Sequence, residues 1–483
     1  MPEEEQKESE NIIREESAAS PQEEEEASAR RSAAGRADLL HGPLLPRIIL
    51  FAIPLAATSI LQQLFNAADT AVVGRFASSR SMAAVGANGS LISLFISLFS
   101  GLAVGTNVVA AHMIGEGRQE NITKAVHTSV TLALLSGVLL IFVGQIFARP
   151  FLAAMGTPED CMELAVLYLR IYFLGMPFIM LYNFNSALLR SEGDSRRPLI
   201  ALILSGIVNV FLNLLLVIVF RLDVAGVAIA TVISNVISSG LTTLFLVREK
   251  GSFHLDLRKL GIDRRILIQI MRIGIPAGLQ GMVFSIANVL IQSGINSFGA
   301  DCVAGNTAAS NFETICYFVV NAFAQTAVTF TSQNYGAGKT DRCDAVLRQC
   351  MAAGLSTTLA LSLVIWIFRG SLIQIFTTDP AVIRFAMTRL LLVCLLELLT
   401  GTYEIPGGCM RGMGYSLTPT LITVLGSCAL RLVWLATVFR AFHTLDVLLI
   451  VYPISWVVTG TATILAFFRV RRHAYAALGR KTS

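Results

Sequence analysis

Charged side chains inside long apolar stretches are the residues of this sequence that could do chemistry. A charge is costly within a membrane-spanning segment, so its presence there marks a candidate for function. The candidates are Asp69, Glu313, Glu397, Glu404 and Arg431. Their carboxylates could take up and release a proton or hold a cation, and the arginine could pair with one of them.

Asp69 is the leading candidate because of its place relative to a proline. It lies about four helical turns after Pro54, in the last third of one apolar stretch. Pro54 lacks a backbone N–H, so it weakens the helix at that point and can act as a hinge. A carboxylate that binds and releases a proton beyond a hinge is suited to coupling proton binding to a bend of the helix. The alternative is that Asp69 lies at the membrane interface and only caps a helix or pairs with a cation.

The second half of the chain offers a different set of acids. Glu397 and Glu404 are seven residues apart, which places them two turns apart on one helical face. Glu404 lies two residues before Pro406 in the Pro-Gly-Gly sequence 406–408, where we expect the helix to be broken. Two interpretations of Glu404 stay open: a buried structural ion pair with Arg431, or a role in binding a cationic substrate or relaying a proton. Glu397 could take the second role instead, and Glu313 is a further candidate.

The composition places these side chains in a membrane. The chain is 54% hydrophobic and 14% charged, whereas soluble domains average roughly 25% charged residues. Apolar runs of about 20 residues or more recur, and each is long enough to cross a hydrocarbon core of ~30 Å. We expect about twelve transmembrane helices, at 46–72, 83–114, 122–148, 162–190, 197–220, 224–247, 266–297, 301–333, 343–368, 380–410, 418–441 and 445–469.

Several functional classes lack their motifs in this sequence. No zinc-protease helix motif, nucleophile elbow or metal-binding His/Cys spacing occurs, and no phosphate-binding loop is complete. We therefore expect neither an enzyme nor an ATP-driven pump, and no cofactor, bound metal or nucleic-acid partner. The eight cysteines show no CxxC spacing and are interpreted as small apolar packing residues.

Charge patterning divides the chain. The start of the chain is rich in Glu runs and lacks apolar periodicity, which is typical of disorder. Basic residues gather in one set of loops, so both termini should be cytoplasmic in a multi-pass protein of the plasma or inner membrane. The predicted parts are a disordered acidic cytoplasmic tail (1–45), a six-helix lobe (46–247), a cytoplasmic loop (248–265), a second six-helix lobe (266–469) and a basic cytoplasmic tail (470–483).

The two lobes repeat each other. Ile53-Pro54 recurs 222 positions later as Ile275-Pro276, and Arg190-x-x-Gly193-x-x-x-x-Pro198 recurs 221 positions later as Arg411-x-x-Gly414-x-x-x-x-Pro419. Ordered matches at a nearly constant offset indicate duplication of a six-span unit. Six spans keep both copies in the same orientation, and transporters with such parallel repeats bind substrate between the halves.

These motifs also carry a family resemblance. Ile53-Pro54, the stretch 69–74 (Asp-Thr-Ala-Val-Val-Gly), the stretch 83–86 (Ala-Ala-Val-Gly) and the two Arg-x-x-Gly-x-x-x-x-Pro loops resemble the multidrug and toxic compound extrusion (MATE) family. The resemblance covers roughly residues 44–469. It implies two pseudo-symmetric lobes in a V-shaped bundle around a central cavity. It also implies export of organic, often cationic, compounds in exchange for H⁺ or Na⁺.

The resemblance implies a cation-coupling site in the first lobe. Pro54 and Asp69 match its hinge and its acid, Asn209 and Asn213 lie four apart on one helical face, and Thr231 follows on the next span. Many relatives carry an aspartate where this chain has Asn213. Hard cations favour charged oxygen ligands, so a single carboxylate favours H⁺, although Na⁺ at Asp69 stays open.

The function we predict is secondary active antiport. The protein should export small organic, cationic compounds in exchange for H⁺ or Na⁺ by rocking-type alternating access, as a monomer in the lipid bilayer. Protonation of Asp69 should favour bending at Pro54. The alternatives are a flippase for a lipid-linked precursor, which would gain from an Arg- and Lys-rich cavity, and a membrane receptor or scaffold without transport.

Overall fold

The computed structural model describes residues 38–76 and 78–482, and these residues are helical with no strand. Residues 1–37 of the predicted acidic tail lie outside the described residues. The first group of helices comprises α3 (Leu44–Phe76), α4 (Ser79–Gly115), α5 (Gln119–Ala154), α6 (Glu159–Leu174), α7 (Met176–Ser191), α8 (Arg196–Leu214), η1 (Leu215–Val219) and α9 (Asp223–Val247). We call this group the N-lobe.

The second group, the C-lobe, follows the short η2 (Leu257–Lys259) in the connecting loop. It comprises α10 (Arg264–Asn296), α11 (Ala300–Gly336), α12 (Thr340–Ile367), α13 (Arg369–Gln374), α14 (Pro380–Leu392), η3 (Cys394–Thr400), α15 (Gly401–Gly412), α16 (Leu417–Thr423), η4 (Val424–Ala429), α17 (Leu430–Ala436), α18 (Val438–Ala441), α19 (Leu445–Leu449) and α20 (Val451–Thr482).

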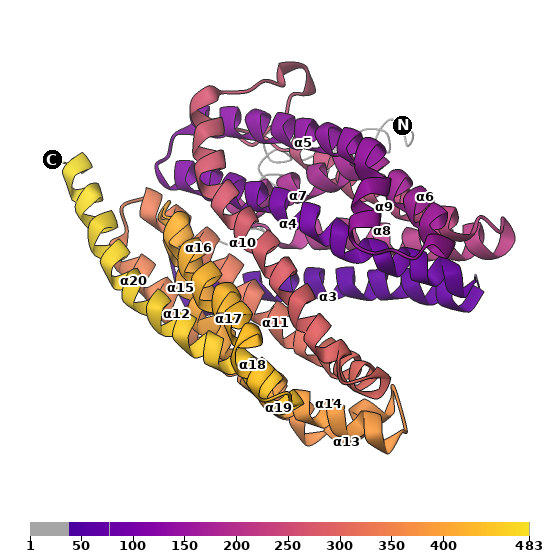
Figure 1. The fold of residues 1–483 in the computed structure, drawn as a ribbon. Helices are drawn as coiled ribbons and strands as arrows, with labels where there is room; N and C mark the ends of the chain where they lie inside the picture. Colours follow the sequence, from indigo (N-terminus) through magenta and orange to yellow (C-terminus); the bar gives the residue numbers. More distant parts are fainter. Residues whose placement is uncertain (1–37, 77, 483) are drawn as a thin grey trace, which may run out of the picture.

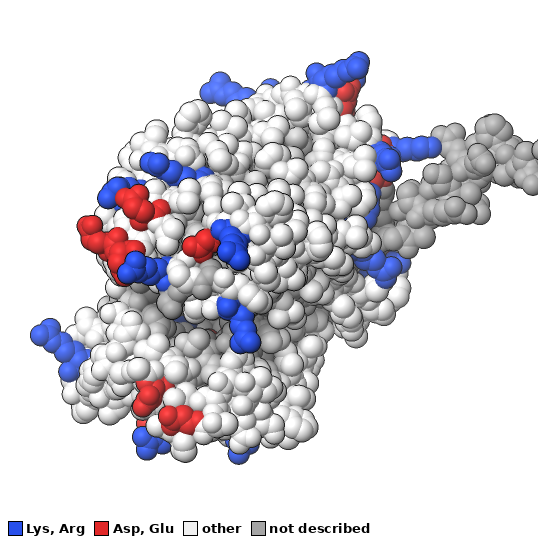
Figure 2. Space-filling view, turned by 90° about the vertical axis from the view of Figure 1, so that its right-hand side faces the viewer, with Lys and Arg blue, Asp and Glu red and all other residues white. Residues whose placement is uncertain are grey.

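The two lobes diverge as a V-shaped helical bundle (Figure 1). Ten helices of the described part are long and apolar enough to cross a membrane, and α6 with α7, bent by 46°, makes an eleventh span. The twelfth expected span corresponds to α14, η3 and α15, which are each too short alone. Seen from the right-hand side of Figure 1, most of the surface is neither acidic nor basic, and a hollow lies between the upper and lower parts (Figure 2). The prediction of an all-α, two-lobed membrane bundle is confirmed.

The expected break near Glu404 was placed too late in the chain. The helix changes at Val393, whose φ and ψ are −115° and −63°, and continues through the 3₁₀ turns of η3. Pro406 instead lies inside α15, which is α-helical from Gly401 to Gly412. A proline in a helix removes only one backbone hydrogen bond, and the buried packing of α15 tolerates that loss.

The ends of the described chain are held against the C-lobe. The segment predicted as a separate basic tail instead continues α20, where the Arg471 guanidinium contacts the Asp344 carboxylate at 2.6 Å. At the other end, Leu39 is buried. Its carbonyl accepts a hydrogen bond from Asn334 Nδ2, and Lys339 Nζ donates to the next carbonyl. The residues just before α3 are therefore ordered by contacts with α11 and the start of α12.

One helix of each lobe begins against the other lobe. The first half of α3 packs its Ile48 and Phe51 into a core built from α11, α12, α15 and α20. The first half of α10 packs its Ile266 and Ile270 into a core built from α4, α5, α7 and α9. Later in α3, Phe65 contacts Gly206 of α8 in its own lobe. Each helix therefore crosses from one lobe to the other along its length.

Glycines allow the lobes to touch at the crossing of α4 and α10. A Cβ added at Gly101 would lie 2.2 Å from the backbone nitrogen of Gly278, and one at Gly105 would lie 2.4 Å from the carbonyl of Ile270. At the crossing of α4 and α11, a Cβ at Gly115 would lie 2.1 Å from the carbonyl of Gln333. Backbones this close require glycine. These contacts close the side of the bundle that carries the connecting loop.

The glycine contact can be tested with a pair of substitutions on α4. Gly101→Ala places a methyl group against backbone atoms of α10, and such overpacking costs about 1–3 kcal/mol. For the efflux that the sequence predicts, measured with a dye, we expect a fall of about tenfold, because the cost applies only when the lobes are closed on this side. Gly86→Ala is the control, since a Cβ there meets nothing within 4 Å. Equal efflux by both variants would show that this contact is not part of the transport cycle.

Candidate functional site

Asp69 lies in a buried polar cluster inside the N-lobe. It is 7% exposed and sits on the half of α3 that packs within its own lobe. Asn213 Nδ2 of α8 donates to Asp69 Oδ1 at 2.5 Å, and Thr231 Oγ1 of α9 donates to Asp69 Oδ2 at 3.1 Å. The same Asn213 amide donates to Asn209 Oδ1 at 3.2 Å. The structure thus brings together the four residues predicted for cation coupling, and their role stays a prediction.

The donor set of this cluster indicates which cation it suits. Asn213 Oδ1 is buried and has no hydrogen-bond partner, so the cluster retains an unused acceptor beside the carboxylate. Asp69 contributes the only charged oxygen among the four residues. The described residues contain no group of three or more His, Cys, Asp or Glu side chains placed to hold a metal ion. One carboxylate with neutral oxygens can bind a proton directly, whereas it makes a weak site for a hard metal cation.

Pro54 occupies the place where α3 passes from one lobe to the other. It lies between Phe51, which stacks edge-on against Phe330 of α11, and the later residues that pack on α8. Here α3 is continuous through the proline. The Pro54 carbonyl accepts a hydrogen bond from Thr58 Oγ1 at 2.7 Å. Because its repeat partner Pro276 occupies the matching place in α10, both prolines lie where a hinge would act between lobes.

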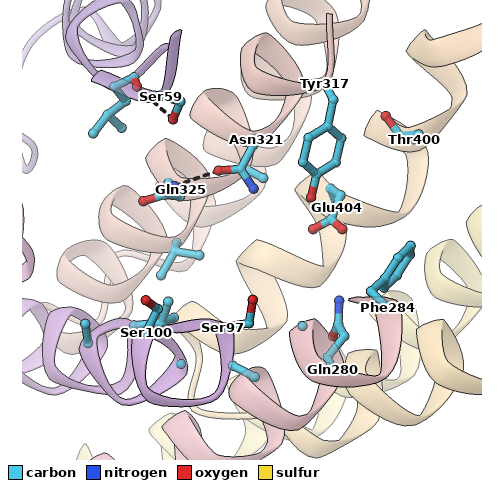
Figure 3. A pocket seen from close by; sticks show the side chains of 18 of the residues that line it. Ser59, Ser97, Ser100, Gln280, Phe284, Tyr317, Asn321, Gln325, Thr400 and Glu404 are labelled. Carbon is cyan, nitrogen blue, oxygen red and sulfur yellow. Dashed lines mark hydrogen bonds between the residues drawn. The ribbon is translucent and has the colours of Figure 1, made fainter. Parts of the chain in front are cut away.

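A central cavity of about 620 Å³ lies between the two lobes. Its walls come from α3, α4, α7 and the start of α8 in the N-lobe and from α10, α11, η3, α15, α17 and α20 in the C-lobe. Ser97, Ser100 and Gln280 lie along one side of the pocket, and Tyr317 and Glu404 lie across from them (Figure 3). Asp69 is not among the lining residues. The buried aspartate and the central cavity are therefore two separate sites.

The cavity wall carries charges of both signs. Its acidic lining residues are Glu313, Glu397 and Glu404, and its basic lining residues are Arg190, Arg411 and Arg431. All four second-lobe candidates named from the sequence therefore face the same cavity. In a site of low dielectric, charges of both signs can hold a polar ligand far more firmly than they would in water.

Comparison with known proteins identifies the family. The MatE family model matches residues 54–215 and 276–467, most of the chain and one segment in each lobe. The chain belongs to the MatE family. It is thus a MATE transporter and not an enzyme, and the resemblance inferred from its sequence motifs is confirmed.

Individual relatives extend along most of this MATE transporter. The probable multidrug resistance protein YoeA of Bacillus subtilis (strain 168) is 28% identical over 382 residues, 78% of this chain and 82% of YoeA. The probable multidrug resistance protein NorM of Thermotoga maritima is 26% identical over 392 residues, 80% of this chain and 83% of NorM. A solved outward-facing multidrug resistance MATE transporter superposes with a TM-score of 0.83 at 24% identity, over 92% of this chain and 98% of its own.

Of the two interpretations of Glu404, the structure does not support the ion pair with Arg431, because no ion pair joins them in the described part of this MATE transporter. Arg431 Nε donates to Ser455 Oγ at 3.1 Å, and its guanidinium lies 4.4 Å from the centre of the Tyr452 ring. The Tyr452 ring and the Ser455 hydroxyl stabilise the Arg431 guanidinium. Arg431 therefore does not neutralise the Glu404 carboxylate.

The buried ion pair of the C-lobe involves an arginine that the sequence analysis missed. Arg389 of α14 forms two hydrogen bonds with the Glu313 carboxylate, at 2.8 and 3.1 Å, and a third with Asn306 Oδ1. This two-pronged contact neutralises Glu313. The signal was present, since Arg389 lies inside an expected span. Glu397 Oε2, by contrast, is buried without a hydrogen-bond partner.

Two cavity arginines had been assigned to loops. Arg190 and Arg411 instead lie in the last turns of α7 and α15 and line the cavity. Arg170, which lies within the expected span 162–190, is exposed and does not line the cavity. The repeat itself held a signal, because Arg190 and Arg411 occupy equivalent places in the two copies.

Proposed function

We propose that this MATE transporter exports small organic compounds that carry positive charge, in exchange for protons, across the cell membrane. The observation that supports this most is the central cavity between the lobes, where Glu397 and Glu404 lack ion-pair partners among the described residues. An unpaired carboxylate in a site of low dielectric attracts a cation strongly. The names of YoeA and NorM as probable multidrug resistance proteins agree with an organic substrate.

Alternating access follows from how the lobes touch. The glycine contacts of α4 with α10 and α11 close one end of the cavity, and the hollow between the lobes lies toward the other. If the connecting loop and both termini are cytoplasmic, as the basic loops predict, this arrangement is open to the outside. Rocking of the lobes about the crossings would then expose the cavity to the cytoplasm, with one chain sufficient for the cycle.

The proton is the coupling ion that the N-lobe cluster favours. Asp69 is the sole carboxylate among its partners Asn209, Asn213 and Thr231, and it lies outside the cavity. Coupling between a substrate and an ion is a reciprocal free energy between two sites. Here the two sites are connected by α3, which lines the cavity near Thr58 and carries Asp69 beyond it.

The carboxylates of the cavity weigh against the flippase alternative. A lipid-linked pyrophosphate would favour a cavity wall lined by basic residues alone. Here Glu397 and Glu404, which have no ion-pair partner among the described residues, line the wall beside its arginines and would repel a pyrophosphate. A receptor or scaffold without transport would leave both the cavity and the membership of a transporter family without a role.

Efflux from inverted vesicles tests the proposed function. Vesicles containing the protein would be given a fluorescent organic cation and an imposed pH or Na⁺ gradient. We expect uptake into the vesicle when its interior is acidic and no response to Na⁺ alone. Dye movement driven only by Na⁺ would replace the coupling ion, and no movement with either gradient would reject antiport of organic cations.

A further inference from the structure

Two arginines at one end of the central cavity have no carboxylate partner among the described residues. Arg190 Nη1 donates to Gln325 Oε1 at 3.1 Å, and Arg411 Nη2 donates to Gln280 Oε1 at 2.7 Å. Arg411 is 9% exposed, and its Nε is buried without a hydrogen-bond partner. A guanidinium has five N–H donors in a planar fork. The glutamine bond occupies one of these donors in each arginine, and no described carboxylate neutralises either charge.

Their surroundings explain how these charges tolerate burial without an acid. Each lies in the last turn of its helix, where the unpaired carbonyls present a partial negative charge. Both helices end in a turn through a glycine of positive φ, Gly193 at 92° and Gly414 at 90°. Helix ends of this kind stabilise a cation without occupying the whole guanidinium, as a carboxylate would.

The helix ends that carry the two arginines come from opposite lobes to the same stretch of α11. Arg190 bonds to Gln325, and Gly412, the neighbour of Arg411, packs against the carbonyl of Val328 less than one turn further along. The Gln325 amide is fixed in turn, since its Nε2 donates to Asn321 Oδ1 at 2.7 Å. The glutamines hold the guanidinium groups in place along the cavity wall, at the end closed by the α4 crossings.

We propose that Arg190 and Arg411 form an anion-binding subsite that takes the carboxylate or another oxyanion group of a zwitterionic substrate. The cationic part of the same molecule faces Glu404 and Glu397. The inference rests on the proposed function in one respect, that the central cavity is the transport cavity. It narrows the substrate class from organic cations to organic molecules with separated charges of both signs.

The spacing of the charges defines the size of the ligand. Glu404 precedes Arg411 by seven residues of α15, which corresponds to about 10 Å along a helix axis. A cavity of about 620 Å³ is in the range that holds a drug-sized molecule. A rigid aromatic cation with a carboxylate at its far end would fit both charges together.

A matched pair of dyes tests this subsite. One dye is a xanthene cation with a free carboxylate, and the other is its methyl ester, which differs only in the negative charge. Binding of both to the purified full-length protein in detergent would be followed by fluorescence anisotropy. We expect the wild type to bind the acid about tenfold more tightly than the ester, as one well-oriented charged contact allows.

Substitution of the arginines should remove this preference. In Arg411→Gln and in Arg190→Gln we expect the ratio of the two dissociation constants to fall from about ten towards one. Lys variants, which keep the charge and lose the fork, should give intermediate ratios. Arg149→Gln is the control, because Arg149 pairs with Glu163 outside the cavity, and it should keep the wild-type ratio. The melting temperature of each variant shows whether it is folded.

The result that would overturn the subsite is distinct from failure of the proposed function. Equal binding of acid and ester by the wild type overturns the subsite. An unchanged ratio of dissociation constants in both Gln variants also overturns it. Where a Gln variant does not fold, an unchanged ratio in the corresponding Lys variant has the same meaning. An arginine-dependent preference in a protein that moves neither dye in vesicles would leave the subsite standing and reject the antiport.

Discussion

Asp69→Asn is expected to abolish efflux driven by a pH gradient while the protein still inserts and folds. Asn213 and Thr231 donate hydrogen bonds to the Asp69 carboxylate, and an asparagine has the same shape with one oxygen to accept them. The amide cannot take up or release a proton at any relevant pH. Coupling requires that proton binding and substrate binding change each other's affinity. If Asp69 cannot bind a proton, this mutual dependence is lost and the pH gradient no longer drives efflux.

The route from Asp69 to the cavity runs along α3. The carboxylate is not in the cavity wall, but Thr58 and Ser59 on the same helix are. Pro54 lies beyond them, where α3 passes to the other lobe. A change in the charge of Asp69 alters how the later half of α3 packs on α8 and α9. Bending at the proline would carry that change to the cavity and to the lobe contact.

Vesicles with an imposed pH gradient provide the measurement, with a cationic dye as the transported compound. Asp223→Asn is the matched control. Asp223, at the start of α9, accepts a hydrogen bond from Ser81 Oγ of α4 and lies outside the Asp69 cluster. Efflux should be retained in the control and lost in Asp69→Asn. Retained pH-driven efflux in Asp69→Asn would move the proton site to Glu404 or Glu397. An inactive variant beside a Na⁺-driven wild type would keep the site and change the ion.

The N-lobe cluster could be predicted from sequence because its spacing is local. Asn209 and Asn213 share a helical face through the four-residue period, and the match to a family motif joined them to Asp69 and Thr231. The same holds for the glycines at 101 and 105, whose spacing is typical of close helix packing. The structure confirms that packing at the crossing with α10.

The C-lobe contacts could not be predicted in the same way, because they depend on which helix faces which. The sequence suggested a pair between Glu404 and Arg431. In the structure the Arg431 guanidinium instead lies over the Tyr452 ring, and Arg389 forms the ion pair with Glu313. Counting charges by span also hid Arg190 and Arg411, because a helix end in a cavity and a cytoplasmic loop look alike in sequence. The packing of the first halves of α3 and α10 against the opposite lobe likewise depends on tertiary structure and could not be predicted from the sequence.

Glu404→Gln is expected to weaken binding of a purely cationic ligand at neutral pH by about tenfold or more. Glu404 is buried on α15 and points into the cavity beside the Tyr317 hydroxyl (Figure 3). A unit charge about 4 Å from a cation contributes about 4 kcal/mol at an effective dielectric constant of 20, and desolvation offsets part of it. Glutamine keeps the shape and removes the charge, so the loss of affinity measures the electrostatic part.

The binding isotherm of the methyl ester dye gives this result without a contribution from the arginine subsite. Glu163→Gln serves as the control, because Glu163 is an exposed carboxylate outside the cavity. If only Glu397→Gln weakens binding, the cation faces Glu397 instead, whose Oε2 has no hydrogen-bond partner. Unchanged binding in both cavity variants would exclude these carboxylates as the cation site. Asp69→Asn should bind the ester as the wild type does, so lost binding and lost coupling assign the two sites separately.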